Sequence, residues 1–103
     1  MKTKEEELTI LRRAKALIEK GWTQNTWCRD AKGNELNADS TDAVCWCLSA
    51  ALGRAANDYG ALYLGPLDNI IGHYYIDWND APERTQAQVV KALEQAIAYA
   101  EQT

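Results

Sequence analysis

The sequence predicts a mainly α, single-domain bundle of about four helices arranged around a central apolar helix. Apolar residues recur at three- and four-residue steps over several long stretches, and this period is typical of amphipathic helices. Sequences of the capping-box type precede two of these stretches. A chain of 103 residues can bury a core without disulfides or a structural metal. We therefore expect residues 1–103 to form one globular domain.

The first helix is predicted over residues 3–20. Thr3 and Glu6 have capping-box spacing, in which each side chain accepts a hydrogen bond from a free backbone N–H at the start of the helix. Gly21 follows the last helical residue and is expected to take the left-handed conformation that ends many helices. One stripe of the helix is apolar and consists of Ile10, Leu11, Ala14, Leu17 and Ile18.

Residues 22–40 show no sustained period. Asp30 and Gly33 occupy the first and fourth positions of a type I turn between residues 27–29 and 34–36. The sequence therefore allows a short β-hairpin between the first two helices. A two-stranded ribbon is only marginally stable alone, so such a hairpin must lie against the helices.

The second helix is predicted over residues 43–56, with Thr41 as its N-cap. Only Ser49 and Arg54 interrupt a run of apolar and small residues. A helix that is apolar on all sides is normally buried on all sides, so this segment is expected to be the central helix. Its small residues should let another backbone approach closely, and Gly60 should end it.

Two further helices are predicted towards the C-terminus. Apolar spacing favours one over residues 67–77, preceded by Pro66, although Gly72 in its middle costs about 1 kcal/mol relative to Ala. Residues 79–82 are typical of the turn that follows. Thr85 and Gln88 then form a second capping box before an amphipathic stretch whose apolar face is Val89, Val90, Leu93, Ala96, Ile97 and Ala100.

Composition excludes several classes of function. The net charge is −4 and no cluster of Lys and Arg is visible, so nucleic-acid binding is not expected. No segment reaches the ~18 apolar residues of a membrane span, and the N-terminus has no apolar run. We expect a cytoplasmic protein without membrane contact. Three Cys, an odd number, favour reduced thiols over a disulfide framework.

The cysteines do not predict a metal site. Cys45 and Cys47 are two residues apart and would diverge on a helix, and the chain has a single His to complete a set of ligands. We expect no metal and no cofactor, with Cys47 a small buried hydrophobe. A catalytic alternative would use Cys28 or Cys45 as nucleophile, with His73 as base and Asp77 orienting its imidazole.

No known sequence signature surrounds any Cys, and four-residue spacing of His and Asp also describes an ordinary ion pair. We therefore assign no catalytic residue. Phosphate loops, dinucleotide fingerprints and calcium loops do not occur either.

The densest polar and aromatic cluster spans residues 73–80 and continues to Arg84. Large rigid aromatic side chains beside hydrogen-bonding groups are typical of recognition surfaces. The candidate binding residues are His73, Asp77, Trp78, Asn79, Asp80 and Arg84, together with Trp46 from the second predicted helix. The alternative is structural: Trp78 and Tyr74 would belong to the core, and Asn79 and Asp80 would cap a turn.

Two motifs, Ala-Val-Cys-Trp-Cys at residues 43–47 and Trp-Asn-Asp at residues 78–80, are the most distinctive parts of the chain. Together with further positions, they resemble a family of small uncharacterised proteins encoded by bacteria and phages. The resemblance covers nearly the whole chain and implies a self-contained intracellular domain, but no catalytic residue. Many members have Gly-Ala where this chain has Ser49 and Ala50. The further positions are Ala14, Leu17, Ile18, Gly21, Trp22, Arg29, Asp30, Gly33, Asp42, Ala51, Leu52, Arg84, Thr85, Val89, Ala96 and Ile97.

These observations favour a non-enzymatic protein-binding or regulatory module, such as a homodimer or a phage-type inhibitor of a larger protein. The alternative is a small enzyme or ligand-binding domain that uses residues 73–84. A closed apolar pocket beside His73 would favour the alternative. A flat exposed patch bearing Trp22, Trp27 or Trp46 would favour the binding module.

Overall fold

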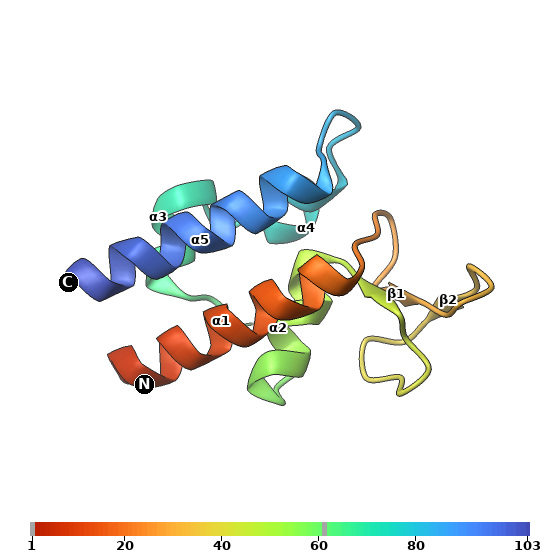
Figure 1. The fold of residues 1–103 in the computed structure, drawn as a ribbon, viewed down its shortest axis with the longest axis horizontal. Coiled ribbons are helices and arrows are strands. Elements are labelled where there is room, and N and C mark those ends of the chain that lie inside the picture. Colours follow the sequence, from red (N-terminus) through yellow and green to blue (C-terminus); the bar gives the residue numbers. More distant parts are fainter. Residues whose placement is uncertain (1, 61) are drawn as a thin grey trace.

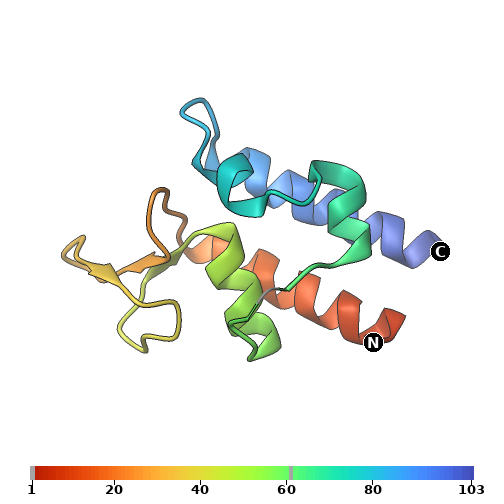
Figure 2. The same cartoon turned by 180° about the vertical axis from the view of Figure 1, so that it is seen from behind.

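The computed structural model describes residues 2–60 and 62–103, which form five helices and one small sheet. The long helices α1 and α5 lie side by side and run antiparallel, so both termini lie at one end of the molecule (Figure 1). The sheet lies at the other end. Figure 2 shows the molecule from behind, with α3 and α4 in front of α5. In this layer α3 packs on α5. The elements are α1 (Lys4–Lys20), β1 (Cys28–Arg29), β2 (Glu35–Leu36), β3 (Cys45–Trp46), α2 (Leu48–Ala56), α3 (Gly65–Ile71), α4 (Tyr75–Asp80) and α5 (Gln86–Gln102).

The first and last predicted helices are confirmed, and each begins with a complete capping box. Thr3 Oγ1 accepts from the Glu6 N–H at 3.1 Å, and the Thr3 N–H donates to Glu6 Oε1 at 3.0 Å. Thr85 and Gln88 repeat this exchange at the start of α5. The apolar stripes of both helices enter one core, which contains Leu11, Ala14, Ile18, Val89, Leu93 and Ala96.

The expected left-handed conformation of Gly21 is wrong. Its φ of −178° and ψ of 138° are extended, and extended backbone is open to any residue. The glycine is needed for a different reason: the Trp46 N–H donates to the Gly21 carbonyl at 3.1 Å. A Cβ at Gly21 would overlap the Val44 carbonyl oxygen and lie 2.9 Å from Cys45 Cβ. β3 can therefore pack here only against a residue without a side chain.

The hairpin is confirmed and gains a third strand. β1 pairs antiparallel with β2 through the turn at residues 30–33, where Gly33 has a φ of 86° and its N–H donates to the Asp30 carbonyl at 3.0 Å. β3 pairs antiparallel with the other edge of β1, which places Cys28 opposite Trp46. The strand order is β2-β1-β3.

The predicted helix over residues 43–56 is wrong in its first third. Cys45–Trp46 is β3, and α2 begins only at Leu48 with Cys47 as its N-cap, in place of Thr41. The backbone N–H groups of Val44, Trp46 and Cys47 donate to the carbonyls of Arg29, Gly21 and Trp27, respectively. These bonds to segments distant in the sequence replace the helical ones, so residues 43–56 do not form the single central apolar helix that was expected. α2 ends at Ala56, where Asn57 takes the left-handed conformation, and not at Gly60.

The expected single helix over residues 67–77 is also wrong, because Gly72 divides it into α3 and α4. Gly72 has a φ of 82°, a conformation that L residues rarely adopt. Pro66 does lie in the first turn of α3, as predicted. Asn79 and Asp80 belong to α4, and the following turn is closed by the Arg84 N–H donating to the Ala81 carbonyl at 2.9 Å.

Candidate functional site

Asn79 joins three segments of the chain and has no exposed surface. Its Oδ1 accepts hydrogen bonds from Trp22 Nε1 at 2.7 Å and from the Leu48 N–H at 3.0 Å. Its Nδ2 donates to the Thr23 carbonyl at 3.1 Å. The amide therefore holds α4 against the start of α2 and against the segment that follows α1. Asn79 therefore lies within α4 and connects distant segments, and it does not cap a turn as the structural alternative expected.

The loop before the hairpin is fastened to the end of α4. Gln24 Nε2 donates to the Asn79 and Ala81 carbonyls at 2.9 and 2.8 Å, and the Asn25 N–H donates to Asp80 Oδ1 at 2.9 Å. Asn25 itself has a positive φ of 67°. These contacts fix the position of the hairpin relative to α4.

Trp78 and Arg84 pair with each other. Arg84 Nε donates to the Trp78 carbonyl at 2.8 Å, and its guanidinium carbon lies 4.0 Å from the centroid of the Trp78 ring. Such cation–π contacts stabilise an exposed turn by roughly 0.5–1 kcal/mol. This pair closes the turn between α4 and α5.

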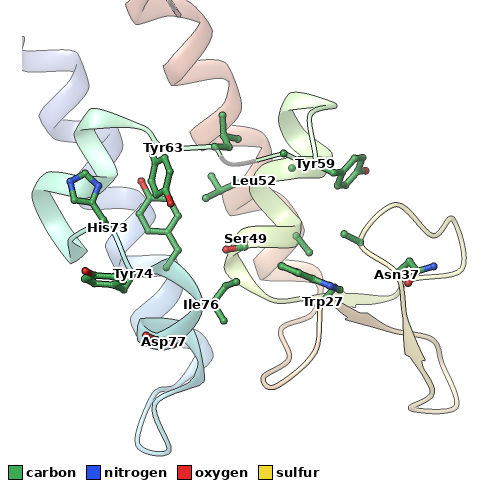
Figure 3. A pocket seen from close by; sticks show the side chains of 16 residues that line it. Trp27, Asn37, Ser49, Leu52, Tyr59, Tyr63, His73, Tyr74, Ile76 and Asp77 are labelled. Atoms are coloured by element: carbon green, nitrogen blue, oxygen red, sulfur yellow. The ribbon is translucent and has the colours of Figure 1, made fainter.

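A groove of about 740 Å³ lies between α4 and α2. Figure 3 shows Tyr63 and Ile76 on the α4 side, opposite Leu52, Ser49 and Trp27 on the side of α2 and the hairpin. The rings of His73 and Tyr74 lie at the outer edge of the α4 side, and the Tyr59 ring lies on the far side of α2. The groove is beside His73, as the ligand-binding alternative expected, but it is an open cleft and not a closed pocket (Figure 3). Both walls belong to elements whose relative position Asn79 fixes.

Exposed apolar side chains gather in this groove. Among the described residues, seven large hydrophobic side chains are exposed, and five of them line it. Trp27 is 42% exposed and Tyr74 is 78% exposed. Monomeric proteins seldom expose large apolar side chains together unless the surface binds something. The five are Trp27, Tyr59, Tyr63, Tyr74 and Ile76.

His73 is paired with Asp68 and not with Asp77. His73 Nδ1 lies 3.0 Å from Asp68 Oδ2, and the Tyr75 hydroxyl donates to Asp68 Oδ1. Burial and the hydrogen bond to Asp68 raise the pKa of Tyr75, which keeps the hydroxyl protonated as a donor. The Tyr63 ring meets the His73 ring edge-on at 5.6 Å. Because His73 lies before α4 begins, it and Asp77 do not share one helix.

The cysteines do not complete a catalytic arrangement with His73. Cys28 is fully buried, and this burial raises the pKa of its thiol to about 11. Cys45 Sγ lies 3.8 Å from the Arg29 carbonyl, and neither thiol belongs to the groove lining described above. Cys47 is buried as predicted, and its pKa is raised by burial. Within residues 2–60 and 62–103, no group of three or more His, Cys, Asp or Glu side chains could hold a metal ion.

Trp46 lies in the core and is separate from the groove. It is 5% exposed, and its ring centroid is 5.8 Å from the Arg54 guanidinium carbon. Of the seven candidate residues, His73 and Asp77 line the groove, and Asp80 lines a neighbouring hollow.

The sequence does not predict Tyr59 and Tyr63 as site residues, because they follow no helical stripe and lie outside the regular elements. Tyr74 belongs to the predicted cluster, but its placement in the core under the structural alternative is wrong, since it is 78% exposed. The available signal was two tyrosines close to Gly60, in a segment where the helical pattern breaks.

The part of the chain that the structure describes contains no helix that is both long and apolar enough to cross a membrane. No curated protein and no solved structure matches the chain. One family model does match, and it spans residues 2–99. The chain therefore belongs to the family of unknown function DUF6197.

Proposed function

We propose that this protein is a non-enzymatic protein-binding module that holds an extended segment of a partner protein in the groove between α2 and α4. The observation that carries the proposal is the gathering of five exposed large apolar side chains along one groove. Four of them are Trp or Tyr, which supply much of the binding energy in many protein interfaces.

The groove is held in shape before any partner arrives. Its two walls are joined by the buried Asn79 amide and by Gln24, which donates to two carbonyls at the end of α4. Binding then costs little ordering of the module itself, which favours affinity. A cytoplasmic inhibitor of a larger protein, encoded by a bacterium or phage, is one form that such a module takes.

The test begins with a random 12-residue peptide library selected against the immobilised protein. The dissociation constants of the selected peptides are then measured by calorimetry for wild type, Trp27→Ala and Ile76→Ser. We expect each variant to bind at least about tenfold more weakly, because truncation of a hot-spot residue costs about 2 kcal/mol or more and about 1.4 kcal/mol already corresponds to tenfold. Trp27→Ala also alters the hairpin, so a loss of binding in this variant alone could have a structural cause. Ile76→Ser, on α4, provides an independent test. Circular dichroism checks that both variant proteins are folded.

Tyr99→Ala is the matched control, since Tyr99 is an exposed aromatic on α5 outside the groove lining. Unchanged affinity in this variant together with losses in the other two supports the proposal. Equal affinities in all four proteins contradict it. A concentration-dependent dimer that Trp27→Ala dissolves would show that a second copy occupies the groove, which also contradicts a partner segment.

A second candidate, a small hydrolase, has one observation in its favour. Asp68 binds His73 Nδ1 at the edge of the groove, which leaves Nε2 free to take a proton. Hydrolysis of p-nitrophenyl acetate by the wild type at pH 7.5 tests it. A rate that falls to the buffer value in His73→Gln supports this candidate, whereas equal rates for the two proteins exclude it for this ester.

A further inference from the structure

The groove does not end at Trp27. A second hollow of about 760 Å³ adjoins it, and Trp27, Asn37 and Ile76 line both. These three residues therefore form a common border. A segment bound along the first groove can continue across this border without leaving the surface.

The second hollow differs from the first in its charge. Three carboxylates line it, from Glu35 on β2, Asp39 in the following loop and Asp80 at the end of α4. Both hydrogen bonds described for Asp80 are accepted by Oδ1, from Asn25 and Asn79, so Oδ2 can still accept from a ligand. Asp77 adds a fourth carboxylate in the first groove.

No Lys or Arg among residues 2–60 and 62–103 lines either hollow. Arg29 is close in the sequence but donates to Thr23 Oγ1 and to the Gly33 and Gln24 carbonyls. Arg54 donates to the Ser40 carbonyl at 3.1 Å. The lining of the second hollow therefore contains carboxylates but no Lys or Arg side chain that could neutralise them.

An aromatic ring next to several carboxylates is suited to a cation. The face of an indole attracts ammonium and guanidinium groups, and carboxylates bind guanidinium through short, charge-assisted hydrogen bonds. The half-exposed Trp27 side chain provides the aromatic ring at the border of the two hollows. Glu35, Asp39 and Asp80 provide the carboxylates.

We propose that the second hollow binds a Lys or Arg side chain of the same partner segment whose apolar part occupies the first groove. This inference rests on the proposed function, which it makes more specific: the partner segment is basic at one end and apolar or aromatic at the other. An acidic or purely apolar segment would leave the carboxylates without a counter-charge.

The experiment uses the peptides selected on wild-type protein. Each is resynthesised with Arg replaced by citrulline, its uncharged isostere, or with Lys replaced by Gln. We expect Lys or Arg to be enriched over the library, and the uncharged peptide to bind wild type at least about tenfold more weakly. On the double variant Glu35→Gln/Asp39→Asn, which keeps Asp80, the difference between the two peptides should be at least about threefold smaller than on wild type.

Glu5→Gln/Glu83→Gln is the control, because it removes the same charge at two exposed positions outside both hollows. It should keep the wild-type preference. Equal affinity of charged and uncharged peptides for wild type, with binding still lost in Trp27→Ala, would overturn the basic-side-chain site and leave the proposed function standing. Peptides that bind Trp27→Ala as tightly as wild type would overturn both.

Discussion

The indole N–H of Trp22 donates a 2.7 Å hydrogen bond to the side-chain oxygen of Asn79, 57 residues further along the chain. The same oxygen accepts from the Leu48 N–H at the start of α2. One buried amide thus connects the end of α1 with α2 and α4. The groove exists between α2 and α4 because this connection sets their relative position.

Asn79→Ala should lower the free energy of unfolding by about 3 kcal/mol. The substitution leaves Trp22 Nε1 and the Leu48 N–H without their acceptor, and each buried unsatisfied group costs roughly 1–3 kcal/mol. Urea denaturation followed by circular dichroism measures the loss. Asn69→Ala, at an exposed position in α3, is the control and should change stability by less than about 0.5 kcal/mol. Similar values for both variants would remove Asn79 from its structural role.

Gly21→Ala should destabilise the protein by about 1–3 kcal/mol, the usual cost of overpacking. The added methyl group would overlap the Val44 carbonyl and force β3 away from the end of α1. The thermal unfolding midpoint reports the effect. Gly65→Ala is the matched control because no neighbouring atom lies within 4 Å of the Cβ it would add. A Gly21→Ala protein as stable as the Gly65→Ala protein would show that close approach is not the reason for this glycine.

Stability should fall as the pH rises from about 9 to about 11. The pKa of Cys28 is raised by burial from 9.0 to about 11, so between these values the folded chain binds more protons than the unfolded chain. The free energy of unfolding therefore decreases with pH, and Cys28 accounts for about 2 kcal/mol of the loss. Urea denaturation at several pH values measures the slope. Cys28→Ala should show a shallower slope, and an unchanged slope would contradict the assignment.

Cys45 should be the first thiol to react with Ellman's reagent in the folded protein at pH 8. It is partly exposed, whereas Cys28 and Cys47 are buried and burial raises the pKa of each thiol. We expect the two buried thiols to react at least about a hundredfold more slowly, until urea unfolds the chain. Peptide mass spectrometry identifies the modified residue, and rapid labelling of Cys28 would be the contrary result.

Local signals in the sequence predicted the structure well where neighbours along the chain decide it. Both capping boxes and the turn between Asp30 and Gly33 form as expected, because their hydrogen bonds link residues two to four positions apart. The prediction failed at residues 43–47. There the backbone bonds to Gly21, Trp27 and Arg29, and no local pattern reveals such distant partners.

The candidate site was predicted only in part for a related reason. His73 and Asp77 line the groove, but Asn79 is buried because its partners Trp22 and Leu48 come from other segments. Whether a side chain in a polar and aromatic cluster faces solvent or another segment depends on tertiary packing. Tyr59 and Tyr63 line the groove from the irregular segment between α2 and α3. This segment has no helical or strand periodicity in its sequence from which the orientation of its side chains could be predicted.

The most direct test of the groove as the binding surface is an NMR titration of the ¹⁵N-labelled protein with a selected peptide. We predict that the largest shifts occur at the Trp27 indole N–H and at the backbone amides of residues 73–77. Signals from the exposed face of α5, including Tyr99, should remain in place. Shifts confined to α1 and α5, with Trp27 and residues 73–77 unchanged at saturation, would contradict the account.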